Sequence, residues 1–281
     1  MLTTIKRAIP TPLKATLRRS FYNAYSLVPG VRSEFEPPFW MDFVGNTAPG
    51  QFGPVGRELL QQARNFAGLQ QFHDVLDIGC GVGHFAAALV PFLEPQARYE
   101  GFDIVPSGIA WCRKAITAKH PQFHFQVADI YNSYYNPDGR FRGQDYRFPY
   151  DDASFDFIVL ISVFTHMMKP EIDHYLSEIR RVLRPEGRVL LTAFLLSADA
   201  RAAIERGHTT GANPLARRFG FSLPDGARVD DIEKPEAAIA HDVDWFIAAC
   251  QQHSLRVTMR PGNWCRENDS HHVHDFVILS K

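Results

Sequence analysis

Residues 75–83, Val-Leu-Asp-Ile-Gly-Cys-Gly-Val-Gly, decide the fold that this chain predicts. The apolar run at the start predicts a buried β-strand, and glycines at every second position predict a turn directly after that strand. Gly79, Gly81 and Gly83 lack a Cβ atom and tolerate positive φ angles, so their backbone can approach a bound molecule closely. Residues 84–89 then predict a helix whose first N–H groups face the same molecule.

His84 separates this turn from the glycine fingerprint of dinucleotide-binding proteins. That fingerprint, G-x-G-x-x-G, requires a glycine where the chain has His84. A nicotinamide-dependent oxidoreductase is therefore disfavoured as a function.

Length and composition favour one elaborated domain. The chain has 281 residues, 45% hydrophobic content and a net charge of -1, so nothing in the overall charge attracts nucleic acid. Its four cysteines lie far apart without a C-x-x-C pair, which is typical of the reducing cytoplasm. Because no apolar run approaches the roughly 18 residues of a membrane span, we expect a soluble, cytoplasmic protein.

Apolar runs alternate with helical patterns along the chain, which predicts βαβ units around a parallel sheet. The expected strands are Val75–Ile78, Tyr99–Asp103, His124–Ala128, Phe155–Ser162, Arg188–Leu195, Leu255–Arg260 and Asp275–Leu279. The expected helices are Gly56–Leu69, Phe85–Phe92, Ser107–Lys119 with Ser107 as N-cap, Lys169–Leu183 and Asp244–His253.

Three segments interrupt this pattern and suggest the domain organisation. Residues 1–50 are predicted to form an N-terminal helical or cover segment, and residues 51–281 the main domain. Tyr131–Asp152 is an irregular connection of unusual length. Residues 197–242 have weak periodicity with several Pro and Gly, and we interpret them as a lid inserted into the domain.

The strand and glycine turn together resemble motif I of the class I S-adenosylmethionine-dependent methyltransferases, an acidic residue followed by G-x-G-x-G. The resemblance runs from residue 75 to about 196 and returns at the C-terminal strand pair. It implies an α/β Rossmann-like doubly wound sheet with helices on both faces. It further implies the strand order 3-2-1-4-5-7-6 with an antiparallel last strand, and S-adenosyl-L-methionine as cofactor.

In open α/β sheets, ligands bind beyond the carboxyl ends of the strands, where this chain places three carboxylates. The resemblance assigns Asp77 to the amino group of the methionine moiety and Asp129 to the adenine amino group. Asp103 can accept both ribose hydroxyl hydrogens. Each alone is also a common cap or turn residue, but their register with the glycine turn favours a cofactor site. The complete predicted set is Asp77, Gly79, Cys80, Gly81, Gly83, Asp103, Ile104 against adenine, Asp129, the Ile130 N–H and Ser162.

His166 is the predicted catalytic base, because it follows the fourth strand, where the resembling family places residues that face the methyl acceptor. An imidazole can take a proton at neutral pH, and a positioned base contributes about 10² to 10⁴ in rate to a hydroxyl acceptor. His166 is equally consistent with a structural role at the junction between strand and helix.

Histidines and aromatic residues near the predicted site leave further alternatives open. His271, His272 and His274 are close in sequence, but without a fourth ligand at a recognised spacing we predict no metal site. Aromatic residues of the irregular connection are consistent with an acceptor wall or with a small core under the loop. They are Tyr131, Tyr134, Tyr135, Phe141, Tyr146 and Phe148, and Trp264 has the same ambiguity.

We therefore expect a methyltransferase that modifies an oxygen of a small molecule, such as a sugar, glycolipid or secondary metabolite. A protein-directed methyltransferase and a non-catalytic binding subunit with the cofactor fold are the alternatives. Residues 1–33 are basic, and the first acidic residue is Glu34. This segment is consistent with peripheral membrane contact, with a cover for the active site, or with a solvated terminal helix. The acceptor and the oligomeric state do not follow from the sequence.

Overall fold

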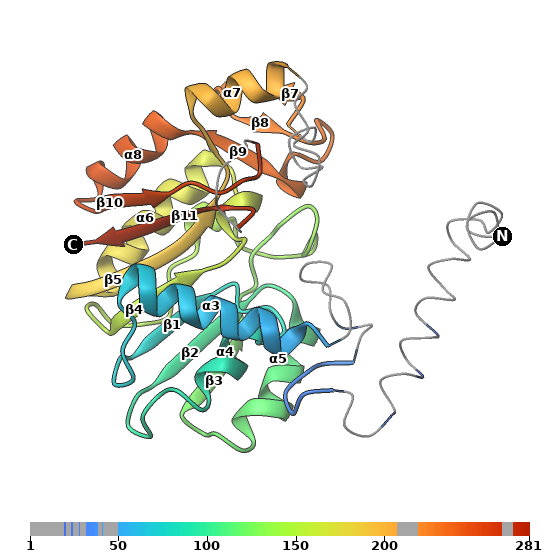
Figure 1. Ribbon diagram of the computed structural model, residues 1–281, viewed down its shortest axis with the longest axis vertical. Coiled ribbons are helices and arrows are strands. Elements are labelled where there is room, and N and C mark those ends of the chain that lie inside the picture. The colour runs from blue at the N-terminus through green and yellow to red at the C-terminus, as the bar shows by residue number, and fades with distance from the viewer. Residues whose placement is uncertain are drawn as a thin grey trace.

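The computed structural model describes residues 20, 24, 28, 32–38, 41, 50–206, 219–265 and 272–281. Its centre is a seven-stranded sheet with the order β10-β11-β5-β4-β1-β2-β3 (Figure 1). The strands are β1 (Val75–Ile78), β2 (Tyr99–Asp103), β3 (Phe123–Val127), β4 (Phe155–Leu160), β5 (Leu183–Ala193), β10 (Arg256–Arg260) and β11 (Asp275–Ser280).

The pairing of the strands confirms the predicted topology. Strand β1 pairs in parallel with β2 and β4, and the parallel arrangement continues to β3 on one side and β5 on the other. Strand β11 enters between β5 and β10 and is antiparallel to both. When the seven strands of this sheet are numbered 1 to 7 in chain order, their order is 3-2-1-4-5-7-6.

Helices cover both faces of the sheet. Successive side chains of a strand point to opposite faces, so each strand contributes to two core clusters. Phe157 and Val159 of β4 pack in one core cluster, whereas Ile158 and Leu160 pack in the other. Helices α3 (Phe52–Ala67), α4 (His84–Leu89) and α5 (Pro106–Cys112) line the first cluster. Helices α6 (Lys169–Val182) and α8 (Val243–Gln252) line the second.

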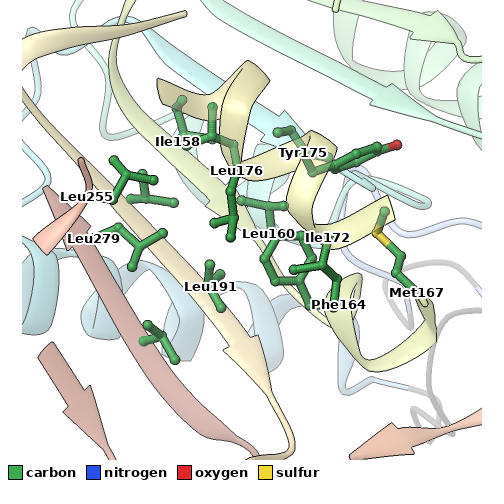
Figure 2. Packing of buried hydrophobic residues seen from close by; sticks show 14 of the residues in the cluster. Ile158, Leu160, Phe164, Met167, Ile172, Tyr175, Leu176, Leu191, Leu255 and Leu279 are labelled. Atoms are coloured by element: carbon green, nitrogen blue, oxygen red, sulfur yellow. The ribbon is translucent and has the colours of Figure 1, made fainter. Parts of the chain in front are cut away.

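Helix α6 holds the segment that follows β4 in place. Its apolar residues Ile172, Leu176 and Ile179 recur at helical spacing and are fully buried. Figure 2 shows Ile172 and Leu176 packed in the core cluster with residues of the strands. Burial of such a side chain stabilises the fold by about 1.5 to 3 kcal/mol. The Glu171 carboxylate accepts the Met168 N–H at 2.8 Å and so caps the first turn. The residues just before α6 are therefore anchored to a rigid element.

Some predicted boundaries were wrong, and each has a local cause. Ser107 is not an N-cap: α5 begins at Pro106, whose fixed φ suits a first helical turn, and the N-cap is Val105. Strand β4 ends at Leu160 instead of Ser162, because Ser162 adopts φ 58° and leaves the extended conformation. Strand β5 begins five residues early, because Leu183 already pairs with Phe155 of β4.

The predicted lid contains regular structure of its own. It holds α7 (Ala198–Glu205) and a second sheet with the order β6-β9-β8-β7. These strands are β6 (Leu195–Leu196), β7 (Phe221–Ser222), β8 (Arg228–Val229) and β9 (Ile239–Asp242). Trp264 is fully buried, with its ring centroid 5.2 Å from those of Phe194 and Phe219. Trp264 is thus part of the small core beneath this lid.

Two predicted segments, the lid and the basic N-terminal segment, lie partly or mostly outside the described residues. Residues 207–218 of the lid are not described, and neither are the basic residues of segment 1–33 apart from Arg32. The Arg32 guanidinium donates to the Glu36 carbonyl at 3.5 Å. Among the helices of the described ranges, none combines the length and the apolar character of a membrane span.

Candidate functional site

The glycine turn after β1 has a backbone that other residues cannot adopt without strain. Gly79, Gly81 and Gly83 have φ angles of 76°, 54° and 86°. A Cβ atom at Gly79 would lie 2.5 Å from Cγ2 of Val163, and one at Gly83 would lie 3.0 Å from the Cys112 sulfur. The side chains of Val163 and Cys112 therefore pack against the turn, and glycine is needed at both positions.

Asp103 joins this turn to the end of the neighbouring strand β2. Its Oδ2 atom accepts the Gly81 N–H and its Oδ1 atom accepts the Val105 N–H, both at 2.8 Å. Burial raises the pKa of Asp103, although these backbone hydrogen bonds oppose the change. Each carboxylate oxygen has a second lone pair, so the side chain can still accept hydrogens from a ligand such as a ribose.

Asp77 is a buried residue of β1, just before the same turn, and is a second carboxylate near Asp103. Its Oδ2 atom accepts the Tyr99 hydroxyl hydrogen at 2.6 Å. Burial raises the pKa of Asp77 to about 7, and the charge of Asp103 contributes to the increase. Two buried acidic groups this close favour a cationic ligand, because a positive charge would offset the cost of ionising both.

The end of β3 is engaged in contacts within the protein. The exposed Asp129 carboxylate pairs with the Arg140 side chain, whose hydrogen bond lowers the pKa of Asp129. The Ile130 N–H donates to the Ala128 carbonyl at 2.8 Å. Ile104, at the end of β2, is half-buried and packs against the cluster beneath α6. The adenine roles assigned to these three residues stay predictions.

The segment after β4 places His166 beside the lid. Ser162 adopts a positive φ of 58° and donates its N–H to the Thr192 hydroxyl at 2.8 Å. The chain then forms a short 3-10 helix, Phe164–His166. The Nδ1 atom of His166 lies 2.9 Å from the main-chain carbonyl oxygen of Glu236. Because a carbonyl only accepts, this contact requires a proton on Nδ1, and the lone pair of the neutral ring is on Nε2.

Tyr135 contacts His166 and is influenced by the charge of Asp103. Its ring meets the His166 ring edge-on, with the centroids 5.3 Å apart. Burial raises the pKa of Tyr135, and the charges of Tyr134 and Asp103 add to this, so its hydroxyl lies in the electrostatic range of Asp103. The sequence singled out Tyr135 only as one of six loop aromatics, and no spacing linked it to His166.

The other aromatic residues of the irregular connection divide between core and surface. Phe148 is 1% exposed and belongs to the main core, whereas Tyr134 and Phe141 are 56% and 44% exposed. Phe148 is therefore a core residue, whereas the acceptor wall stays a prediction for the exposed rings.

The two described C-terminal histidines, His272 and His274, contact different residues. The Gln62 amide donates to Nδ1 of His272 at 2.9 Å, whereas the His274 ring lies 4.8 Å from that of Phe194. His271 lies outside the described residues. Within the part of the chain that the structure describes, no group of three or more His, Cys, Asp or Glu side chains is placed to hold a metal ion.

Comparisons with known proteins point to one family. The family model described as "Methyltransferase domain" matches residues 75–187. A phthiotriol/phenolphthiotriol dimycocerosates methyltransferase of Mycobacterium leprae is 32% identical over 41% of this chain and 35% of its own length. Methyltransferase GfsG of Streptomyces halstedii is 27% identical over 61% of this chain and 56% of its own. A fatty-acid O-methyltransferase of Mycolicibacterium smegmatis is 30% identical over 42% and 36%. The chain thus spans about a third to just over half of these relatives.

Solved structures share the fold. A candidate O-methyltransferase from Nostoc punctiforme superposes with a TM-score of 0.54 at 15% identity, over 82% of this chain and 57% of that chain. The PH0226 protein from Pyrococcus horikoshii gives a TM-score of 0.50 at 16% identity, over 92% and 97%. At these identities the likeness concerns the architecture alone.

Proposed function

Because the family model of a methyltransferase domain matches residues 75–187, we propose that this protein is a class I S-adenosyl-L-methionine-dependent methyltransferase that transfers a methyl group to an oxygen of a small molecule. The observation that carries the proposal is that the turn held by Asp103 packs against Val163, three residues before His166. The glycine turn and the base candidate follow neighbouring strands, β1 and β4, at their carboxyl ends. Ligands of such sheets bind at this edge.

The described residues fit the cofactor. The three glycines of the turn carry no side chain that could keep a ligand from the backbone, and buried Asp77 and Asp103 suit the ammonium and ribose groups of S-adenosylmethionine. When bound, this cofactor supplies an electrophilic methyl group on a sulfonium sulfur. The remaining task of the protein is to align the acceptor, and orientation of this kind is worth roughly 7 to 11 kcal/mol.

His166 can act as the general base for a hydroxyl acceptor. With its Nδ1–H directed at the Glu236 carbonyl, the neutral ring has its basic lone pair on Nε2. Removing the hydroxyl proton at Nε2 makes the acceptor oxygen a better nucleophile. An acceptor that is already ionised, such as a carboxylate, would not need this step.

Two features support a small acceptor with both polar and apolar parts. Exposed aromatic rings of the irregular connection, Tyr134 and Phe141, offer flat surfaces for a sugar ring or an acyl chain. One relative is named for O-methylation of fatty acids. The lid reaches His166 through Glu236, and a lid in contact with the base supports a small molecule better than a protein acceptor.

A methyl-transfer assay tests this proposal. The purified chain is incubated with S-adenosylmethionine labelled in its methyl group and with sugars, glycolipids and fatty acids, and the products are identified by mass spectrometry. We expect label on oxygen in at least one class. The variant His166→Ala should lower turnover by about 10² to 10⁴ and leave cofactor affinity nearly unchanged.

The matched control is His124→Ala, at the amino end of β3, which should retain wild-type turnover. Label on a protein instead of a small molecule would favour the protein-directed alternative. Cofactor binding without transfer to any acceptor would favour the non-catalytic one. Equal turnover of wild type and His166→Ala would remove His166 from the mechanism.

A further inference from the structure

Glu236 contacts two different segments through its two ends. It lies in a short 3-10 helix of the lid, Pro235–Ala237, and is 8% exposed. Its main-chain carbonyl oxygen is 2.9 Å from Nδ1 of His166. Its Oε2 atom accepts the Ser133 N–H at 2.6 Å and also accepts the Ser133 hydroxyl hydrogen. The lid is thereby joined to the loop after β3 at the position of His166.

The loop that carries Ser133 is itself ordered around His166. The Asn132 side-chain oxygen accepts the N–H groups of Tyr134 and Tyr135 at 3.0 and 2.9 Å, which closes an Asx turn. The Asn132 amide donates to the main-chain carbonyl of His166 at 3.4 Å. Ser133 therefore donates to Glu236 from a loop that is also bonded, through Asn132, to the main chain of His166.

We propose that Glu236 is a positioning residue for His166. Its carbonyl holds the imidazole as the Nδ1–H tautomer, and its carboxylate keeps that carbonyl in place by binding Ser133. The protonated nitrogen of a neutral histidine is set by the hydrogen bond that the ring makes, and this tautomer leaves the basic lone pair on Nε2. The role in catalysis rests on the proposed function, whereas the tautomer itself does not.

Nuclear magnetic resonance of the histidine side chains tests the tautomer directly. With ¹⁵N-labelled protein at a pH where His166 is neutral, the wild type should show a protonated Nδ1 and an unprotonated Nε2. Glu236→Ala should shift His166 towards the Nε2–H tautomer. Glu236→Gln should restore the wild-type signature, because both Ser133 donors go to one oxygen that an amide can replace. Glu233→Ala, an exposed glutamate of the same lid, is the matched control and should change nothing.

Activity adds a second readout. Turnover of Glu236→Ala should fall by about 10-fold or more, but by no more than the 10² to 10⁴ that the base itself supplies, while the KM for the cofactor stays constant. If Glu236→Ala does not fold, Ser133→Ala removes only the hydroxyl donor and should shift the tautomer in the same direction. A wild-type tautomer in folded Glu236→Ala and Ser133→Ala would overturn the proposal. Absence of any methyl transfer by the wild type would instead overturn the proposed function and leave the tautomer result standing.

Discussion

At the scale of single residues, Gly79 shows why its own position in the turn after β1 tolerates no side chain. Its N–H donates to the Phe102 carbonyl at 2.8 Å, so the residue cannot move away from Val163 without losing this bond. Gly68 has a similar φ of 71° but no atom within 4 Å of a built Cβ. Comparing substitutions at these two glycines therefore separates the energetic cost of a positive φ angle from the cost of a close contact with Val163.

We therefore predict that Gly79→Ala destabilises the protein more than Gly68→Ala. A left-handed conformation costs a non-glycine residue about 1 to 2 kcal/mol, and only Gly79→Ala adds a displacement of Val163. Urea denaturation measures both free energies of unfolding. Equal losses for the two variants would contradict the close contact that the turn requires.

Asp77 gives a prediction about pH. Its ordinary pKa is 3.8 and its folded pKa is about 7, so the folded state binds more protons than the unfolded state between these values. Stability attributable to Asp77 therefore falls as pH rises from about 4 to about 7 and is constant above. Asp77→Asn can still accept from Tyr99 but does not titrate.

The unfolding free energy of Asp77→Asn should therefore exceed that of the wild type at pH 8, by at most about 4 kcal/mol. The difference should shrink towards pH 4. Urea denaturation of the ligand-free protein at several pH values measures this difference directly. Parallel stability curves for the two proteins across this range would show that Asp77 is ionised in the fold.

At the scale of elements, Asp275 ties strand β11 to the lid. Its carboxylate accepts the N–H groups of Leu195 and Gly262 and the indole N–H of Trp264, at 2.8 to 2.9 Å. Leu195 begins β6, and Trp264 lies in the small core beneath the lid. One buried side chain thus serves three donors from two segments, Leu195 and residues 262–264.

Asp275→Ala should lower the free energy of unfolding by about 3 kcal/mol or more, because each buried donor left without a partner costs about 1 to 3 kcal/mol. Asp173→Ala, at an exposed carboxylate paired with His253, is the control and should cost about 1 kcal/mol or less. Chemical denaturation of both variants checks the ranking. A loss for Asp275→Ala no larger than that of the control would show that the lid does not depend on this residue.

The sequence predicted the strands of the main sheet better than the two-residue strands of the lid. Strands β1 and β2 have the predicted bounds, because an apolar run followed by glycine or by a carboxylate marks both ends. The small lid sheet went unpredicted, since strands of two residues carry no periodicity. The contact of His166 with Glu236 joins residues 70 positions apart, and no local pattern records such a distance.

At the scale of the whole molecule, the residues of the proposed site follow the carboxyl ends of neighbouring strands in the main sheet. Strands β1, β2 and β4 end beside one another, and their carboxyl ends carry the glycine turn, the Asp103 carboxylate and the segment of His166. The lid connects to this edge through β6, which follows β5. A cofactor at the turn and an acceptor under the lid would therefore meet near Tyr135.

Calorimetric titration with S-adenosylhomocysteine, the demethylated product of the cofactor, tests this central claim most directly. We predict measurable heat for the wild type, and an affinity lower by roughly 10- to 150-fold for Asp103→Ala, since hydrogen bonds to a charged group contribute about 1.5 to 3 kcal/mol. The control Asp173→Ala should bind like the wild type. Absence of heat with the wild type, or unchanged affinity in Asp103→Ala, would contradict a cofactor site at the ends of β1 and β2.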